Sequence, residues 1–295
     1  MRRPLMRAAK IVSALWISCS PLYAAVAWDH GTRWCRNNAE GVRAKASRLA
    51  RASHGYQGFE YKNGYCAHRE GLSNGHNPSF LGECGFVPFS DLRGFDRSSW
   101  VGTFRGAMLA YGEFRNATVS SVDFTGADLR CTSWTGAIAI LGRFSAASLD
   151  GVRMQAMDLS HTVFSTARLS AADFSGSTLN GARFNGATMV GFNGSRCQGD
   201  GVSFIDVRAP GSLWAESVLS NGLFQGANLQ GANFHSAWLR NVDFTGADLR
   251  RADFRGAALD EALMDGAELE GARYDWRSRL PFSRDEAHAR GMVGP

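Results

Sequence analysis

Residues suited to metal chemistry lie in the first third of the chain. Residues 28–101 hold four histidines and three cysteines, and six of these seven could in principle bind zinc: His30, His54, Cys66, His68, His76 and Cys84. Structural zinc ligands usually come as closely spaced pairs, and the spacing here follows none of those patterns. Because an exported chain more often pairs its cysteines as disulfides, we predict no metal ligands.

Catalytic motifs are missing from the sequence. It has no Gly-rich phosphate loop, no Gly-x-Ser-x-Gly turn and no His-Glu-x-x-His helix. Six aspartates recur one residue before a large apolar residue: Asp123, Asp128, Asp173, Asp243, Asp248 and Asp253. The alternation of strand faces points them outward without a cleft, and the lone His161 and His235 are also expected on the outer surface. We predict no catalytic residues and no cofactor, with an enzyme or metal site in residues 28–101 as a further alternative.

The amino terminus has the pattern of an export signal. Basic residues within Met1–Lys10 precede an apolar run, Ile11–Ile17, and Ala25-Val26-Ala27 forms a cleavage site. The apolar run is much shorter than the roughly 20 residues that span a bilayer. We therefore expect residues 1–27 to be removed, leaving an exported chain, periplasmic, cell-surface or extracellular, with no transmembrane segment.

Charge disfavours nucleic acid as a partner. The formal net charge of +5 includes four bases in the first ten residues. After removal of the leader, 28 bases face 27 acids, which is not the balance of a nucleic-acid-binding protein.

A period of five residues dominates the chain from Phe104 to Tyr274. Large apolar residues recur at every fifth position, and a second column of small residues lies two positions before them. Of the 35 members of that second column, only Met157 and Phe192 are larger than valine. Neither a helix, with period 3.6, nor a flat strand, with period 2, explains this spacing. The chain must turn a corner every five residues.

The large positions alternate between two classes. Of the 18 positions from 104 to 274 in steps of ten, 15 are aromatic; of the 17 positions from 109 to 269, none is aromatic and 12 are leucine. If four short sides make one coil, aromatic residues fill two opposite sides and aliphatic residues fill the other two. Rings would then stack on rings and leucines on leucines.

These residues resemble the pentapeptide-repeat proteins. The segments that carry the resemblance include Ala127-Asp128-Leu129-Arg130, Ala172-Asp173-Phe174-Ser175-Gly176 and Gly226–Phe234. The resemblance implies an all-β fold, a right-handed quadrilateral β-helix with about 20 residues per coil. Coils stacked ~4.8 Å apart would make a rod of about nine coils, ~42 Å long.

Four segments follow from this pattern: a signal peptide at 1–27, a cap region at 28–101, the solenoid at 102–276 and a polar carboxy-terminal tail at 277–295. A solenoid end exposes unpaired backbone and needs a cap. We expect the amino-terminal cap to be a small unit of mixed helix and loop, with the tail closing the other end.

The family also suggests an alternative function. Some cytosolic pentapeptide-repeat proteins imitate DNA through shape and acidity and so occupy a topoisomerase. Here residues 102–239 hold nine acids and nine arginines. Five arginines stand where a mimic would want aspartate: Arg143, Arg153, Arg168, Arg183 and Arg208. Only residues 240–276 are acidic overall, with nine acids against five arginines.

The favoured hypothesis is a non-enzymatic exported rod that presents a surface to an unknown protein or envelope macromolecule, or has a structural role. A homodimer is also compatible with the sequence. One outer column holds a single charge: Thr118, Ile138, Asp158, Thr178, Gln198, Val218, Trp238 and Ala258. Its apolar members Ile138, Val218 and Trp238 are the candidate contact strip. The alternative is a local slip that turns Ile138 and Ile140 inward and Ala139 out.

The repeat is weakest from Gly191 to Ala215. Gly194, Gly199 and Ala209 replace the large residue, while Phe192 occupies a small position. Because the phase resumes at Trp214, either a binding loop or a loosely packed coil would explain the pattern, and we favour the loose coil.

Five cysteines remain after removal of the leader. Cys197 falls in the small inward column, and Cys131 lies at a corner. Three coils separate these two by roughly 14 Å, beyond the ~7 Å limit between bridged Cα atoms. We therefore expect one disulfide among Cys35, Cys66 and Cys84, with Cys66–Cys84 preferred because its loop is short, and a reduced Cys197.

Overall fold

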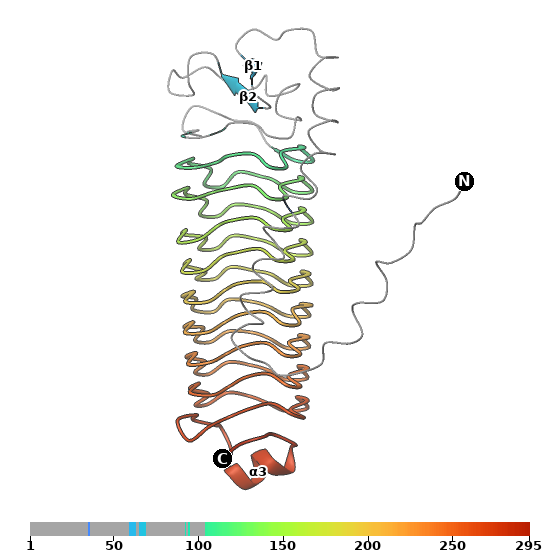
Figure 1. Ribbon diagram of the computed structural model, residues 1–295, viewed down its shortest axis with the longest axis vertical. Helices are drawn as coiled ribbons and strands as arrows, with labels where there is room; N and C mark the ends of the chain where they lie inside the picture. The colour runs from blue at the N-terminus through green and yellow to red at the C-terminus, as the bar shows by residue number, and fades with distance from the viewer. Residues whose placement is uncertain (1–34, 36–58, 63–64, 69–91, 93, 95–103) are drawn as a thin grey trace, which may run out of the picture.

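The structure, a computed structural model, describes residues 35, 59–62, 65–68, 92, 94 and 104–295. Strands β1 (Phe59–Lys62) and β2 (Tyr65–His68) pair antiparallel, with Phe59 opposite His68. This hairpin corrects the expectation of a cap made only of helix and loop, since alternating backbone pairing joins two short strands there. Most of the other residues of the predicted cap lie outside the described residues. From residue 104 onward the chain forms a stack of similar coils (Figure 1).

Each coil has four sides of five residues. One residue on every side pairs in parallel with the residue 20 positions later, as Met108 does with Asp128 and Glu113 with Ser133. The period of 20 and the four sides that the resemblance implies are therefore confirmed. We number the sides in chain order by their inward large residue: first (Phe104), second (Leu109), third (Phe114) and fourth (Val119).

Corners are β-turns with a left-handed residue in their third place. The amide of Ala107 donates to the carbonyl of Phe104 at 3.0 Å, and Gly106 between them has φ +65°. Because φ is positive at the third place, Gly106, but not at the second, Arg105, the turn is of type II, which favours glycine at its third place. Other residues also occupy the position: Tyr111 has φ +62° and Cys131 has φ +59°. The amide of Tyr111 donates to the carbonyl of Arg130 at 2.8 Å, and the amide of Cys131 donates to the carbonyl of Asp150 at 3.0 Å. These hydrogen bonds to the next coil stabilise the left-handed residues at the corners.

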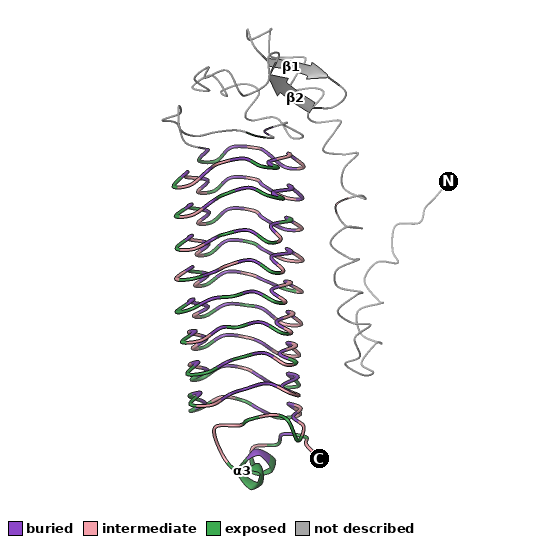
Figure 2. Cartoon of the chain, turned by 90° about the vertical axis from the view of Figure 1, so that its left-hand side faces the viewer, coloured by how far each residue is buried: buried purple, intermediate pink, exposed green. Residues whose placement is uncertain are grey.

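Aromatic rings form two columns inside the rod. On the first side Phe104, Phe124 and Phe144 stack with ring centroids 4.9 Å apart. On the third side Phe114 stacks on Trp134 at 4.0 Å. The two columns meet edge to face, and leucines occupy most of the inward positions on the remaining sides. The predicted alternation is confirmed, and Figure 2 shows the buried segments recurring in every coil. Such pairs add about 0.5–1.5 kcal/mol each beyond area burial.

The coil at residues 191–215 is regular despite its sequence. Asn193 pairs with Asp173 below and with Leu213 above, so neither a loop nor a bulge interrupts the ladder. A Cβ atom added at Gly194 would clash with the ring of Trp214, because the rings of Phe192 and Trp214 already fill this space. Phe192 itself lies 5.0 Å from Phe174 and 5.2 Å from Trp214, measured between ring centroids.

Phe192 thus supplies, from a small position, the ring that Gly194 lacks. Phe192 is fully buried. Both expectations for this segment are corrected: the coil is neither a binding loop nor loosely packed on its third side. The physical reason is that close packing requires each layer of the interior to be filled, and a ring at position 192 fills the space that a ring at position 194 would otherwise occupy.

The carboxy-terminal end carries a helix, α3 (Arg284–Ala289), capped by the side chain of Ser283. Arg279 pairs with Ala258, and Val293 pairs with Arg273, so residues after 276 continue the ladder. Ala287 and Met292 are buried against the last coil. The segment expected as a polar tail therefore covers the apolar end of the rod (Figure 1).

Candidate interaction surfaces

The low-charge column lies on the fourth side of the solenoid. Its eight members pair successively from Thr118 to Ala258, and Ala258 then pairs with Arg279. Ile138 is 47% exposed, whereas Ala139 is fully buried. The alternative of a slip at this point is wrong, because it would have turned Ala139 outward.

The candidate strip divides into two parts. Val218 pairs directly with Trp238, and these side chains are 40% and 60% exposed. Ile138 lies four coils below Val218, about 19 Å away, with Asp158, Thr178 and Gln198 between them. Its exposed apolar neighbour is instead Leu141, at the next corner. The eight residues do lie in one column on the fourth side, but the apolar members of this column do not form one continuous patch.

Trp238 has a cation on its face. The guanidinium of Arg279 lies 5.8 Å from the centre of the indole ring. Trp276, 68% exposed at the end of the rod, carries Arg277 in the same way at 4.7 Å. These contacts orient two large aromatic side chains toward solvent, and aromatic residues with arginine are enriched in protein interfaces.

The outward aspartates are partners of arginines and backbone amides. Asp253 is only 5% exposed and accepts from the side chain of Arg255 at 2.6 Å and from its backbone at 3.1 Å. Burial alone would raise the pKa of Asp253, but these hydrogen bonds outweigh it, so its pKa is lowered. The side chain of Arg250 likewise lowers the pKa of Asp248. A carboxylate held ionised in this way is poorly suited to donate a proton.

Asp173 shows that an outward position can still be buried. It is 5% exposed and accepts hydrogen bonds from Gln155, the backbone of Ser175 and Asn193. Side chains of the adjacent coils cover it. His161 and His235 are exposed, as predicted.

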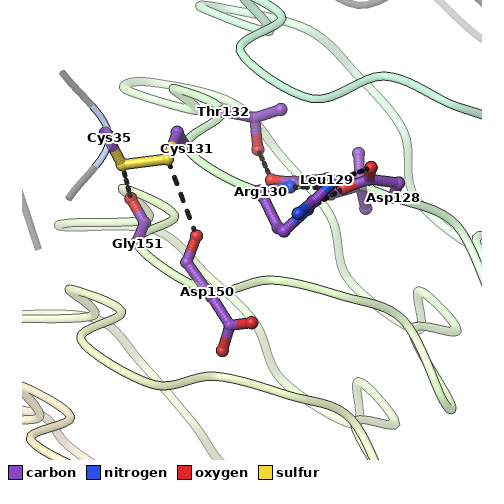
Figure 3. The surroundings of a disulfide bond; sticks show 8 residues. All are labelled: Cys35, Asp128, Leu129, Arg130, Cys131, Thr132, Asp150 and Gly151. Atoms are coloured by element: carbon purple, nitrogen blue, oxygen red, sulfur yellow. Dashed lines mark hydrogen bonds and ion pairs between the residues drawn. A yellow bond between two sulfur atoms is a disulfide. The ribbon is translucent and has the colours of Figure 1, made fainter. Parts of the chain in front are cut away.

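A disulfide joins Cys35 to Cys131, 96 residues later (Figure 3). Their Cα atoms are 5.8 Å apart. Cys131 occupies the left-handed position of a corner between the second and third sides and is 9% exposed. The Sγ of Cys131 lies 3.9 Å from the carbonyl oxygen of Asp150, and that of Cys35 lies 3.9 Å from the carbonyl oxygen of Gly151.

This bond corrects our expectation for Cys35 and Cys131. The sequence predicts a partner for Cys35 only among Cys66 and Cys84, whereas its partner is Cys131 of the solenoid. A corner residue with positive φ directs its side chain away from the core, where it can meet a segment distant in sequence. The preferred Cys66–Cys84 pair involves side chains outside the described residues and stays a prediction.

Cys197 is the one free cysteine among the described residues. It is fully buried, its Sγ lies 3.0 Å from the carbonyl oxygen of Phe174, and burial raises its pKa to about 12. A thiol in this state is neither nucleophilic nor a metal ligand. Cys197 therefore serves as an apolar filler, as the sequence predicts.

Within the described part of the chain, no group of three histidine, cysteine or acidic residues is arranged to hold a metal. One open depression there is lined by Arg250, Glu268 and Arg290, among others. None of the helices in the described ranges is both long and apolar enough to cross a bilayer. The metal candidates in residues 28–101 lie outside the described residues or have side chains that do.

The repeat seen in the structure is also found by comparison with protein families. The family model for pentapeptide repeats matches in eight copies, over residues 147–186, 215–246 and 247–273. The chain belongs to the pentapeptide-repeat family. The gap in the match, residues 187–214, contains the coil in which Phe192 and Gly194 exchange their roles.

Solved pentapeptide-repeat structures resemble parts of this chain. HetL from the cyanobacterium Nostoc, involved in heterocyst differentiation regulation, is 23% identical over 63% of this chain and 89% of its own, with TM-score 0.33. A second Nostoc pentapeptide-repeat protein is 31% identical over 35% of this chain and 84% of its own, also with TM-score 0.33. QnrB1, a plasmid-mediated fluoroquinolone resistance protein, is 17% identical over 71% and 90%, with TM-score 0.40. No curated protein matches the sequence.

Proposed function

We propose that this pentapeptide-repeat protein is a non-enzymatic exported rod that presents its outer sides to an envelope macromolecule. The observation that carries the proposal is the division of the chain into a filled interior and outer columns of different chemistry. Interior positions hold rings, leucines and small residues and are almost all buried. The side chains that are able to recognise a partner therefore lie on the outer columns.

Export is supported by the leader-like residues 1–27 and by the disulfide. Disulfides persist mainly in oxidising compartments, and Cys35 is bonded to Cys131. The oriented Trp238, with Val218 beside it, is the candidate contact on the fourth side.

The alternative is a DNA-mimicking protein that binds a topoisomerase. It needs nearly continuous negative charge, whereas the outer columns carry arginines at 143, 153, 168, 183 and 208. We expect the mature chain not to inhibit supercoiling by a purified topoisomerase, and potent inhibition would favour mimicry instead.

The test is fractionation of native cells combined with crosslinking from the surface. A photoreactive residue in place of Val218 should crosslink to a partner in the envelope fraction, whereas one in place of Leu219, which is fully buried, should not. Recovery of uncleaved chain in the cytoplasm would overturn the export proposal. A hydrolytic or transfer activity that requires residues 28–101 would revive the enzyme alternative.

A further inference from the structure

Four arginines gather along one edge of the rod, where the first and second sides meet. Arg143 and Arg183 stand on the first side, and Arg168 and Arg208 stand on the second. We call these four residues the basic edge and propose that it binds a linear anionic polysaccharide lying along the rod. This inference rests on the proposed function, because it names the class of envelope partner that one outer surface would take.

The spacing of the four arginines follows from the ladder. Val163 separates Arg143 from Arg183, and Thr188 separates Arg168 from Arg208. Each pair is thus two coils apart, about 9.6 Å along the axis. Along the axis the four arginines follow one another in sequence order, one in each of four successive coils, and they alternate between the two sides. With 20 residues per coil, Arg143 and Arg208 are about 16 Å apart along the axis.

The charge on this edge is accessible. All four arginines are exposed, and Arg143, Arg183 and Arg208 take part in no ion pair with another described residue. Several arginines elsewhere on the solenoid are paired with neighbouring acids: Arg130 contacts Asp128 at 2.6 Å, and Arg250 contacts Asp248 at 2.7 Å. On the basic edge, three arginines without an ion pair to a described residue lie together; Arg153, on the third side, is a further one.

Three acids belong to the surroundings of the edge. Asp123 pairs with Arg143 in the ladder, one coil away, and its carboxylate contacts Arg105 at 2.8 Å. Asp150 contacts Arg168 at 2.9 Å, but the Arg168 side chain remains 67% exposed. Asp206 lies on the shared corner near Arg208, with its carboxylate beside Gly226 of the next coil. These three carboxylates reduce the net charge of the edge, but Arg143, Arg183 and Arg208 form no ion pair with them.

The arrangement fits an extended polyanion better than a small anion. The four guanidinium groups are distributed along the axis on two sides of a corner and do not converge on one point. A single phosphate could reach only one or two of them, whereas a chain with regularly spaced carboxylates or sulfates could contact all four. Arginine forks bind such oxyanions by two parallel hydrogen bonds.

The corner between the arginines favours sugars over bases. It carries Ser145, Ser165, Thr166 and Asn185, whose hydroxyl and amide groups suit sugar hydroxyls. Among the described outward residues of the first and second sides, none is aromatic, so bases would have no ring on which to stack.

The test is binding of the full exported chain, purified with its disulfide intact, to oligomeric polyuronate by calorimetry at low salt. We expect R143S/R183S and R168S/R208S each to weaken binding about tenfold or more, and the quadruple variant to abolish it. Serine already occupies outward positions on both sides, at Ser203 and Ser148, so folding should be preserved. Thermal unfolding of each variant checks this.

The matched control is R153S/R196S, which removes two arginines from the third side and from the opposite edge at a similar height. It should change affinity less than about twofold, because neither residue reaches the basic edge. In contrast, D206N should strengthen binding by removing a repulsive carboxylate.

Equal losses in the control and edge variants, or no binding of polyuronate or dextran sulfate, would overturn the inference. Tighter binding of single-stranded dT oligonucleotides or of anionic phospholipid vesicles, with the same dependence on the edge, would also overturn it in favour of that partner. Fractionation and crosslinking at Val218 are unaffected by these results, so the proposed function fails or survives separately.

Discussion

Two coils of the solenoid, residues 131–150 and residues 191–210, are secured in different ways. The first keeps the rings of both aromatic columns in their usual positions, at Trp134 and Phe144, and has a covalent attachment outside through Cys131. The second departs from the repeat inside, where Phe192 replaces the ring missing at Gly194. Both keep the same parallel ladder to their neighbours.

The difference separates two requirements of the fold. The ladder needs only backbone groups and corners, so it continues through either coil. The interior needs a constant filled volume in each layer, which the second coil reaches with exchanged positions. The outer surface has no such requirement. At one of its corners Cys131 forms a disulfide with Cys35, which is distant in the sequence.

A buried charge beneath the exchanged ring should have the largest effect. Phe174 is fully buried and packs against Phe192, so Phe174→Asp should destabilise the chain by more than about 4 kcal/mol. Urea unfolding would measure this. The control is Gln198→Asp, which places the same residue at an exposed position; equal stability of the two variants would contradict the assignment of inner and outer faces.

Exchanging Phe192 and Gly194 tests whether volume or position matters. Phe192→Ser alone should cost about 3–5 kcal/mol through the cavity it leaves. Gly194→Phe alone should be destabilising by about 1–3 kcal/mol or more, since the new ring meets Trp214 and Phe192.

The double variant should recover much of the loss, because it restores the usual arrangement of a small and a large residue. A double-mutant cycle from urea unfolding gives the coupling energy. Simple addition of the two losses would mean that Phe192 does not fill the site of Gly194.

Removing the external attachment should have a smaller, redox-dependent effect. Cys131→Ser opens a loop closed over 96 residues, and we expect a loss of about 2–4 kcal/mol under oxidising conditions. A reducing agent should bring the wild type close to the variant. Cys197→Ala is the control: its loss should be the same with and without reductant, because that thiol is free.

Acidification should produce the smallest effect. Asp253 has a lowered pKa in the folded state, so the stability it contributes is present above its ordinary value of 3.8 and is lost as the pH falls below it. Asp253→Asn should cost about 1 kcal/mol at neutral pH. The difference in melting temperature between wild type and variant should shrink below pH 3.8, and a difference that grew on acidification would refute this sign.

The repeat and most of the interior could be predicted from the order of the residues alone. The period of five fixed the corners, and the alternation of Phe124 with Leu129 fixed which sides hold rings, because these properties depend on local spacing along the chain. The sequence also identified Cys197 as a filler and the outward column that contains Trp238.

Other features depend on neighbours about 20 or more residues away and became visible only in the folded chain. Phe192 compensates for Gly194 because rings from adjacent coils, Phe174 and Trp214, define the space between them. Asp173 is buried by side chains of the coils on either side, although its position points outward. Cys131 meets Cys35 across 96 residues, a contact that no spacing along the chain encodes, since a disulfide depends on where two segments meet in space.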